Sequence, residues 1–557
     1  MTGVIRKLGV GLIVAAALLA PAGAAGAAPG TTTRLSIASD GSESNRESVS
    51  HDVTPDGRFV AFTSWATNLV AGDTQMCGIP FPDYNCRDAF VHDRLNGTTE
   101  LVSVTSNGTQ ANGDSSAAAI SADGRYVVFS SDATNLAADD TNNMPDVFRH
   151  DRFTGDTLRV SYDPTGAELY FTPQGADVSA DGRFVAFSAW QLYMRDMTAG
   201  VTELISMNND GQQANTGAEA PSISEDGRFV AFHSYSSNLS PGDEGFTRDV
   251  FVRDRSLSST ELISVGVPPY GSGHAEGPMI SSDGRFVAFT SYDLLPGDTN
   301  FNPDAFVRDR QVGTTTLVSL DSSGQQVNAG GRAAGVSVDG RFVAFSSTAP
   351  DLVADDTNGT DDVFVRDTWR GNTTRVSVDN TGAESNGHSS GGVLSQSGEI
   401  VIFLSQSTDL VSDDNNGFMD VFAHEQGDSD TDGYWDGGDN CPDLTNPEQA
   451  DADGDLAGDA CDGAGSGNVD CSGPVSGVNS VDALKVLRYS AGLSVAQSEP
   501  CLDIGQPRAL KPPDDWKVGD VDCSGVVNAV DALKILRAVA GLSVIKPAEC
   551  PDIKPPL

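Results

Sequence analysis

One phrase of eleven residues recurs seven times along the chain, and this repeat limits the folds that the chain can adopt. A clear copy is TPDGRFVAFTS, residues 54–64. The glycines of the copies are Gly57, Gly124, Gly182, Gly227, Gly284, Gly340 and Gly398, at spacings of 67, 58, 45, 57, 56 and 58 residues. Self-similarity at such a period is typical of solenoids, propellers and arrays of small units.

Each repeat carries the signals of four short antiparallel strands. Asp-Gly predicts a tight turn, because glycine tolerates the positive φ that the turn needs. The following RFVAF is apolar on both alternating faces, which suits a strand covered by sheets on both sides. In the sixth unit a loop, DLVADDTNGTDD, leads to the strands VFVRD and TTRVSV. Four-stranded sheets repeated radially with both faces buried predict a β-propeller, and a solenoid is the alternative.

The two ends of the repeat predict how the ring closes. The seventh unit ends without a fourth strand, whereas TTTRLSIASDG, residues 31–41, matches the fourth-strand segment TTTLVSLDSSG of the fifth unit. We therefore expect the N-terminal strand to complete the last blade, which would also remove exposed sheet edges.

Over residues 31–425 the repeated phrase resembles the WD40-like, TolB-type propeller repeats of exported bacterial proteins. The resemblance implies a mainly β fold, with a seven-bladed β-propeller over residues 29–427. It says little about function, because propellers serve both as binding modules and as enzymes.

The beginning of the chain and its net charge indicate where the protein acts. Residues 1–28 have the pattern of a signal peptide, with Arg6 and Lys7 before a short apolar run and a small-residue cleavage zone. That run is too short for a comfortable membrane span, so we expect a secreted, soluble monomer without a transmembrane segment. The net charge of −44 argues against a nucleic-acid partner.

The repeats carry no clear catalytic motif. GHSSG, residues 387–391, fits a nucleophile-elbow pattern but lacks the strand–turn–helix context and is better explained as the start of a strand. One aspartate recurs in six repeats and is better explained as architectural, satisfying a turn or pairing with arginine. Its positions are Asp93, Asp151, Asp196, Asp254, Asp309 and Asp367. We predict no catalytic residue.

The loops between the second and third strands leave two possibilities open. Segments such as PGDTNFNPD and ADDTNGTDD could hold Ca²⁺ through carboxylate and amide oxygens, and Asx-turns explain them nearly as well. In the first repeat this loop is longer, and we expect Cys77 and Cys86 to close it. Its apolar residues, Met76, Ile79, Phe81 and Tyr84, could contact a partner or fold onto their own blade.

After Gln426 the chain becomes an acidic segment with carboxylates at every second residue. Such spacing suits a tight loop around a hard cation, because so many aspartates would otherwise repel one another. With its DNCP, NPEQ and GDACD, the segment resembles a thrombospondin type-3 repeat over residues 428–465. The calcium positions implied by this resemblance are Asp428, Asp430, Asp432, Asp436, Asp439, Asp451, Asp453, Asp455 and Asp459.

Two similar loop–helix units follow. The second has an EF-hand-type loop whose predicted Ca²⁺ ligands are Asp520, Asp522, Ser524, Asn528 and Asp531, with Gly525 at the sharp turn. The first loop has three extra residues, and its predicted ligands are Asn468, Asp470, Ser472, Asn479 and Asp482. Together the units resemble a small α-helical dockerin domain, residues 466–557, which implies a cohesin-like partner.

The dockerin resemblance also implies which residues contact that partner. The specificity positions correspond to Ser480, Val481, Ala529 and Val530, and the familiar Ser-Thr pair is absent. An acidic partner could also be contacted by Lys485, Arg488, Lys534 and Arg537, although these residues equally suit a solvated helix face.

Eight cysteines allow 105 pairings. The modules imply Cys77–Cys86, Cys441–Cys461, Cys471–Cys501 and Cys523–Cys550, and an even number suits an oxidising compartment.

These features predict a secreted, calcium-binding, non-enzymatic protein. Its propeller would recognise a protein or glycan, and its dockerin-like module would attach it to a cohesin-type partner. One alternative is an extracellular carbohydrate-active hydrolase or lyase, which a carboxylate pair unique to one or two blades and lining the central pocket would favour. A surface adhesion or structural component is the other alternative.

Overall fold

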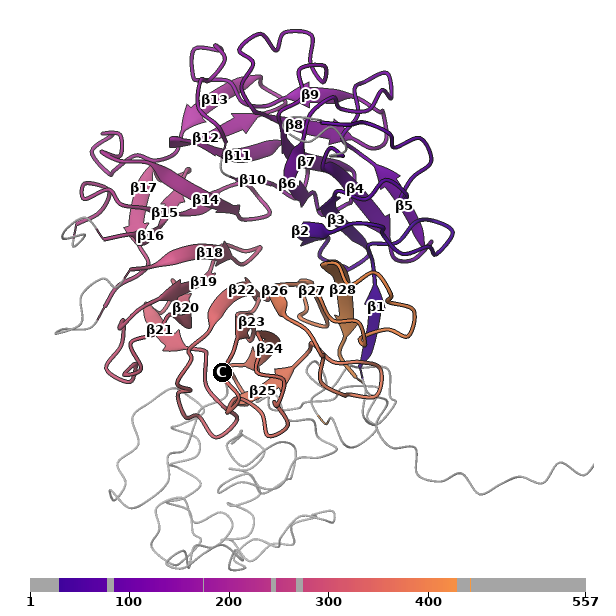
Figure 1. Cartoon of the computed structure of the whole chain (residues 1–557). Helices are drawn as coiled ribbons and strands as arrows, with labels where there is room; N and C mark the ends of the chain where they lie inside the picture. Colours follow the sequence, from indigo (N-terminus) through magenta and orange to yellow (C-terminus); the bar gives the residue numbers. More distant parts are fainter. Residues whose placement is uncertain are drawn as a thin grey trace, which may run out of the picture.

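The structure is a computed structural model that describes residues 30–77, 85–173, 175–241, 247–266, 274–427 and Cys441. Within these residues the strands form seven antiparallel four-stranded sheets arranged as blades around a common centre (Figure 1). The prediction of a mainly β, seven-bladed propeller is therefore confirmed. No helix in these segments could cross a bilayer.

In every blade the strands follow one another outward from the channel in chain order, except that the outermost strand of the last blade is the N-terminal strand. Blades one to three are β2–β5 (Ser48–Val53, Phe59–Ser64, Asp88–Asp93, Thr98–Leu101), β6–β9 (Ser115–Ile120, Tyr126–Ser131, Asp146–Asp151, Thr157–Arg159) and β10–β13 (Ala176–Val178, Phe184–Ala189, Gln191–Asp196, Val201–Leu204). Blades four to six are β14–β17 (Ala218–Ile223, Phe229–Ser234, Asp249–Asp254, Ser259–Leu262), β18–β21 (Glu276–Ile280, Phe286–Ser291, Asp304–Asp309, Thr314–Leu317) and β22–β25 (Arg332–Val336, Phe342–Ser347, Asp362–Asp367, Asn372–Arg375). Blade seven is β26–β28 (Ser389–Leu394, Ile400–Ser405, Asp420–Glu425) with β1 (Thr31–Arg34) outside β28.

The N-terminal strand closes the ring, as predicted. β1 pairs antiparallel with β28 from Thr31 opposite Glu425 to Arg34 opposite Phe422. The pairing continues where Leu35 N donates to Val421 O at 2.7 Å. Thr32 Oγ1 also donates to Val378 O of blade six at 2.5 Å, so β1 holds both its own blade and the preceding one.

The second strand of each blade is buried on both faces, as its sequence pattern indicates. In β3, β7, β11, β15 and β19 only the first residue is partly exposed. A phenylalanine of the second strand stacks on one of the third strand in most blades, with ring centroids 5.7 Å apart for Phe62 and Phe90. Aromatic pairs of this kind repeat the same core from blade to blade.

Both the backbone conformation and the close packing of neighbouring blades require glycine at this position of the repeated phrase. Gly340 has φ of +71°, and a Cβ there would lie 2.3 Å from the ring of Phe286 in the preceding blade. Any larger residue would strain the turn and separate the two blades.

The recurring aspartates are architectural, as predicted. The Asp93 carboxylate accepts from Arg58 Nε at 3.0 Å and Nη2 at 2.8 Å, and from the Leu95 amide at 3.0 Å. The Arg58 hydrogen bonds hold the pKa of Asp93 well below its usual value, and the equivalent Arg183 contact lowers the pKa of Asp196 to about 2. Each pair joins the Asp-Gly turn to the following hairpin.

We expect Ser36→Ala to open the closure of the ring. Ser36 Oγ donates to the buried Asp420 Oδ1 and accepts from Val421 N at 3.1 Å. Losing these contacts should lower the free energy of unfolding by about 1–3 kcal/mol and speed hydrogen exchange at β1 and β28.

Ser377→Ala is the matched control, because Ser377 makes the same contacts inside blade six, with Asp362 and Val363. It should cost similar free energy without faster exchange at β1. Equal exchange at β1 in the two variants would contradict the assignment of Ser36 to the closure.

Candidate functional site

The inner strands of all seven blades surround a central cavity of about 320 Å³. Most of its wall is small or aliphatic, with Ala118, Ala176, Val336 and Leu394 among the lining residues. Its few polar groups therefore decide which ligand it can accept.

One end of the channel is narrowed by the turns that precede the Asp-Gly pairs. Their backbones hydrogen-bond from blade to blade, as where Ala180 N donates to Glu225 O and Glu225 N donates to Ser282 O, both at 2.9 Å. The Gln396 side chain crosses from blade seven, and its Nε2 donates to Ser282 Oγ at 3.1 Å. The cavity itself lies at this end, because its lining includes the turn residues Pro55, Ala122, Ala180, Glu225, Ser282, Val338 and Gln396.

Two aspartates line this cavity, from blades that are not adjacent, and Glu225 in the turn after β14 lines it as well. Asp52 of β2 and Asp177 of β10 occupy the same position, two residues before the Ser or Thr that opens the repeated phrase. The other blades have neutral residues there, namely Ala119, Ser222, Met279, Gly335 and Val393. The pair is thus unique to blades one and three.

Both carboxyls favour their protonated forms more than an exposed aspartate does. Burial, and to a smaller extent the charge of Asp52, raise the pKa of Asp177 to about 7. Burial also raises the pKa of Asp52 to about 6. Near neutral pH the pair can hold one proton, so it can donate one hydrogen bond and accept others.

These carboxyls also tie neighbouring blades together. Asp52 Oδ1 accepts from Val53 N and its Oδ2 from Ile120 N of blade two, both at 2.8 Å. Asp177 in the same way accepts from Val178 N at 2.7 Å and from Ile223 N of blade four at 2.8 Å. Each carboxyl satisfies backbone groups that would otherwise face the channel unpaired.

His51 precedes Asp52 in β2, and its imidazole ring is buried away from water. Among the residues that the structure describes, its buried ring nitrogens have no hydrogen-bond partner. Burial lowers the pKa of His51 to about 4, which the Ile402 backbone offsets only in part, so the ring is neutral at physiological pH. Gly391 of blade seven gives the ring its space, because a Cβ there would lie 2.8 Å from His51 Cε1.

Aromatic residues stand at the other end of the ring, where the inner strands begin. The residue directly after the second strand is Trp65, Trp190, Tyr235 and Tyr292 in blades one, three, four and five. Trp190 is 59% exposed and stacks on Phe171, with centroids 6.5 Å apart. We call Trp65, Phe171, Trp190, Tyr235 and Tyr292 the aromatic rim.

Trp190 is held outward by the shortness of its blade. It is the one residue between β11 and β12, and its φ of 64° is uncommon for a residue other than glycine. The missing loop of blade three thus leaves the indole uncovered.

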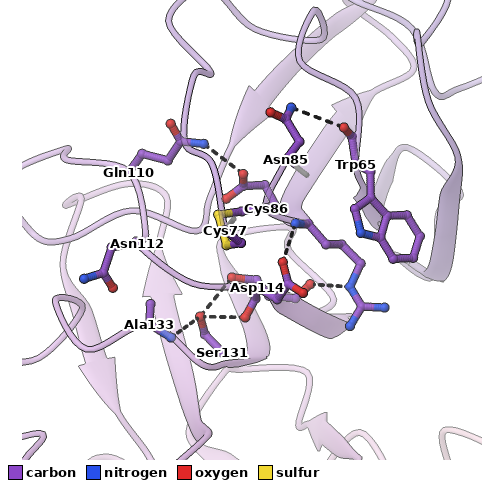
Figure 2. The surroundings of a disulfide bond; sticks show 12 residues. Trp65, Cys77, Asn85, Cys86, Gln110, Asn112, Asp114, Ser131 and Ala133 are labelled. Carbon is purple, nitrogen blue, oxygen red and sulfur yellow. Dashed lines mark hydrogen bonds between the residues drawn. A yellow bond between two sulfur atoms is a disulfide. The ribbon is translucent and has the colours of Figure 1, made fainter. Parts of the chain in front are cut away.

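The disulfide predicted in blade one is present. Cys77 and Cys86 are bonded, with Cα atoms 4.8 Å apart, and Trp65 lies nearby, where its carbonyl accepts from Asn85 Nδ2 (Figure 2). Met76 is 45% exposed, whereas Ile79, Phe81 and Tyr84 lie outside the described residues. The segment Ser389–Leu394 is a strand, as expected for the GHSSG region.

The remaining predicted sites stay predictions. The signal peptide and all predicted calcium and partner-contacting residues of the type-3 repeat and the dockerin-like domain lie outside the described residues. Cys441 is described and is disulfide-bonded, and the other five cysteines of the predicted pairs are not described.

The polar groups of the channel were missed by the sequence reasoning, which predicted no residue there. Aligning the repeats at the position two residues before the conserved Ser or Thr would have singled out Asp52 and Asp177. Aligning the residue after the second strand would have singled out most of the aromatic rim.

No protein-family model matches the chain, and no curated protein does. Among solved structures it is similar to TolB from Acinetobacter baumannii, with 14% identity and a TM-score of 0.32 over 52% of this chain and 59% of TolB. It is also similar to the β-propeller domain of the Trilobed protease from Pyrococcus furiosus, with 11% identity and a TM-score of 0.42 over 68% of this chain and 95% of that one. For an oligogalacturonate lyase in complex with manganese, the identity is 12% and the TM-score 0.43, over 72% and 94%. The fold assignment rests on the strand topology described above.

We expect Asp52→Asn to lower the pKa of Asp177, because it removes the neighbouring charge. The pKa of Asp177 is higher in the folded chain than in the unfolded chain. The carboxyl therefore stabilises the fold fully below its usual pKa, and this stabilisation is lost as pH rises through about 7. Carboxyl titration followed by carbon NMR should therefore show the Asp177 midpoint moving to lower pH in the variant. Asp123→Asn, in an exposed turn, is the control, and an unchanged midpoint in Asp52→Asn would refute the coupling.

Proposed function

We propose that this protein is an exported binding protein whose propeller recognises a neutral glycan at the aromatic rim. Its C-terminal dockerin-like module would attach it, with Ca²⁺, to a cohesin-type partner. The aromatic rim is the observation that carries the propeller's part of this proposal, and the cavity, with its few polar groups, lies toward the other end of the same channel.

The chemistry of the rim and cavity suits a sugar ring. The flat apolar face of a pyranose packs on exposed aromatic rings, and Trp190 and Phe171 offer such a surface at little cost in side-chain entropy. The hydroxyl groups of a sugar need both donors and acceptors, which a partly protonated carboxyl pair supplies. Three acidic side chains line the cavity, Asp52, Asp177 and Glu225, so a uronate or another anionic glycan would be repelled.

A protein ligand is a weaker candidate for the propeller. Exposed aromatic anchors also serve protein interfaces, and the disulfide-closed loop with Met76 lies in the same blade as Trp65. The ring favours a glycan, because exposed aromatic rings and a small cavity with a few polar groups suit a sugar better than a broad protein face.

A glycoside hydrolase is the second candidate, and the Asp52–Asp177 pair favours it. Two carboxyls whose environments separate their pKa values are the usual acid and base of such enzymes. Against this role, each carboxyl already accepts two backbone N–H groups. A lyase acting on uronates fits less well, because its anionic substrate would meet three acids.

The proposed attachment rests on the C-terminal sequence alone. The dockerin-like units imply a cohesin-type partner, and the type-3 repeat implies a Ca²⁺-stiffened spacer between them and the ring. Because ligand carboxylates repel one another until a cation neutralises them, metal binding and folding of this segment would be coupled. A purely adhesive surface component would bind cells through the propeller without such a partner.

We expect Trp190→Ala to weaken binding of the chain to neutral polysaccharides by roughly tenfold or more, because a central exposed indole carries much of such an interface. Affinity electrophoresis and pull-down with a panel of insoluble neutral and anionic polysaccharides provide the measurement. Trp369→Ala is the matched control, since Trp369 is 49% exposed in a hairpin at the opposite end of its blade.

Binding of neutral polysaccharide by the wild type and Trp369→Ala, but not by Trp190→Ala, supports the proposal. Equal binding by all three chains, or binding confined to anionic polysaccharides, would refute it. Release of reducing sugars by the wild type but not by Asp52→Asn would establish the hydrolase instead.

A further inference from the structure

Five blades place two aspartates together where the loop after the second strand meets the third strand. The first aspartate lies in the loop and the second begins the third strand. The pairs are Asp73 and Asp88, Asp140 and Asp146, Asp298 and Asp304, Asp356 and Asp362, and Asp414 and Asp420. Asp140 is half-buried and the other nine are buried.

Two further positions near each pair vary together from blade to blade. Where the fourth strand ends in arginine, the residue nine positions later is glutamate. Where it ends in leucine, that residue is glutamine. The combinations are Arg34 with Glu43, Arg159 with Glu168 and Arg375 with Glu384, against Leu101 with Gln110 and Leu317 with Gln326. Because either combination is neutral in sum, the aspartate pair leaves each cluster with a net charge of −2.

Neither combination neutralises the pair. In blade five, Gln326 Nε2 donates to Asp298 Oδ1 and to Asp304 Oδ2, both at 2.9 Å. Gln110 makes the same bridge in blade one, to Asp73 Oδ1 at 2.7 Å and to Asp88 Oδ2 at 2.8 Å. Figure 2 shows Gln110 beside the disulfide. An amide bridges two negative groups without supplying a positive charge.

In blade six the guanidinium of Arg375 takes the place of the glutamine amide of blades one and five. Arg375 Nη1 lies 3.3 Å from Glu384 Oε1 and 4.0 Å from Asp356 Oδ1. Its single positive charge is offset by Glu384, so the two aspartates are again uncompensated. In blades two and seven the exposed Asp139 and Asp413 also contact the outer nitrogen of the arginine, at the solvent side.

Some carboxylate oxygens in these clusters are buried and lack a hydrogen-bond partner within the part of the chain that the structure describes. They are Asp73 Oδ2, Asp140 Oδ1, Asp146 Oδ2, Asp298 Oδ2, Asp356 Oδ2 and both oxygens of Asp414. Of these, Asp146 Oδ2 and Asp414 Oδ1 lie 3.6 Å and 3.5 Å from an arginine nitrogen. Asp298 is only 1% exposed, and leaving such an oxygen unpaired is costly. In blade six, carboxylate oxygens of Asp356, Asp362 and Glu384 all lie within 4.8 Å of one another.

Blade three shows that the fold itself does not need the carboxylates. This blade has no loop between β11 and β12, and Gln191 stands where the other blades have the second aspartate. Ser206 Oγ donates to Gln191 Oε1 as Ser319 Oγ donates to Asp304 Oδ1. In the blade that lacks the loop, a neutral amide makes the hydrogen bond that the second aspartate makes elsewhere. The negative charge is therefore associated with the loop and is not needed to form the blade.

We propose that each of these five clusters binds one hard divalent cation, with Ca²⁺ the first candidate. Closely spaced carboxylate oxygens are the ligands that such a cation prefers, and water can complete the coordination. The charge of −2 that the aspartate pair contributes in all five clusters matches the charge of the ion, and Asp139 and Asp413 add one more negative charge in blades two and seven. The sites are separate from the calcium positions predicted after residue 427, and they would fix the loops at the same end of the ring as the aromatic rim.

A shared proton is the competing explanation. Burial raises the pKa of Asp88 and of Asp304 to about 7 in the absence of an ion, so a proton could neutralise half of each pair. Cation and proton would compete, and Ca²⁺ binding should weaken as pH falls below 7.

The test compares bound calcium in the full chain and in two variants of blade five. After equilibrium dialysis against CaCl₂ at pH 8, elemental analysis should find about one calcium ion fewer per chain in Asp298→Asn and in Asp304→Gln. Asp304→Gln copies the arrangement of blade three and should therefore fold. Asp283→Asn, in the turn at the opposite end of the same blade, should keep the wild-type number.

If both variants retain the near-ultraviolet circular dichroism of the wild type and also its calcium number, the proposal is wrong and the shared proton accounts for the pairs. A readout without substitution is anomalous scattering from wild-type crystals soaked in Mn²⁺ at pH 8. A peak between Asp298 and Asp304 is expected, and its absence would also overturn the proposal.

Discussion

The backbone hydrogen bonds between β1 and β28 join the two ends of the propeller. Without them β28 would be an exposed edge, and blade six would lose the contact that Thr32 makes with Val378. The closure also keeps the seven inner strands around one channel. Every functional feature of the ring, from the carboxyl pair to the aromatic rim, depends on that arrangement.

The channel shows how binding chemistry and architecture share the same groups. Asp52 and Asp177 each hold an inner strand of the next blade through a backbone N–H, and Ser222 makes the same contact to Ile280 N at 3.1 Å. A carboxyl in this role is buried and its pKa raised, which leaves it able to share a proton with a ligand. Burial gives these residues their unusual protonation, the backbone hydrogen bonds oppose it, and any function in the channel would use groups that also tie neighbouring blades together.

Local sequence patterns predicted much of the ring and little of its channel. The Asp-Gly turns, the doubly buried second strands, the closing strand and the Cys77–Cys86 bond depend on short-range signals or on an obvious repeat. An architectural role for the recurring aspartates was predicted because they recur in register, whereas their arginine partner, such as Arg58 for Asp93, was not named. Asp52 and Asp177 were missed because their meaning depends on which position of each inner strand faces the axis, and bulges in several of these strands shift that position. The exposure of Trp190 depends on the loop missing from blade three, and this consequence appears only in three dimensions.

A crosslink between Thr31 and Glu425 tests the closure most directly, because both side chains are exposed and the residues are opposite each other in the β1–β28 register. In the oxidised Thr31→Cys/Glu425→Cys chain, peptide mass spectrometry should find the new disulfide. Its melting temperature should exceed that of the reduced form, because the bond closes a very long loop. Two thiols that remain free and reactive in the folded chain would contradict a ring joined by its N-terminal strand.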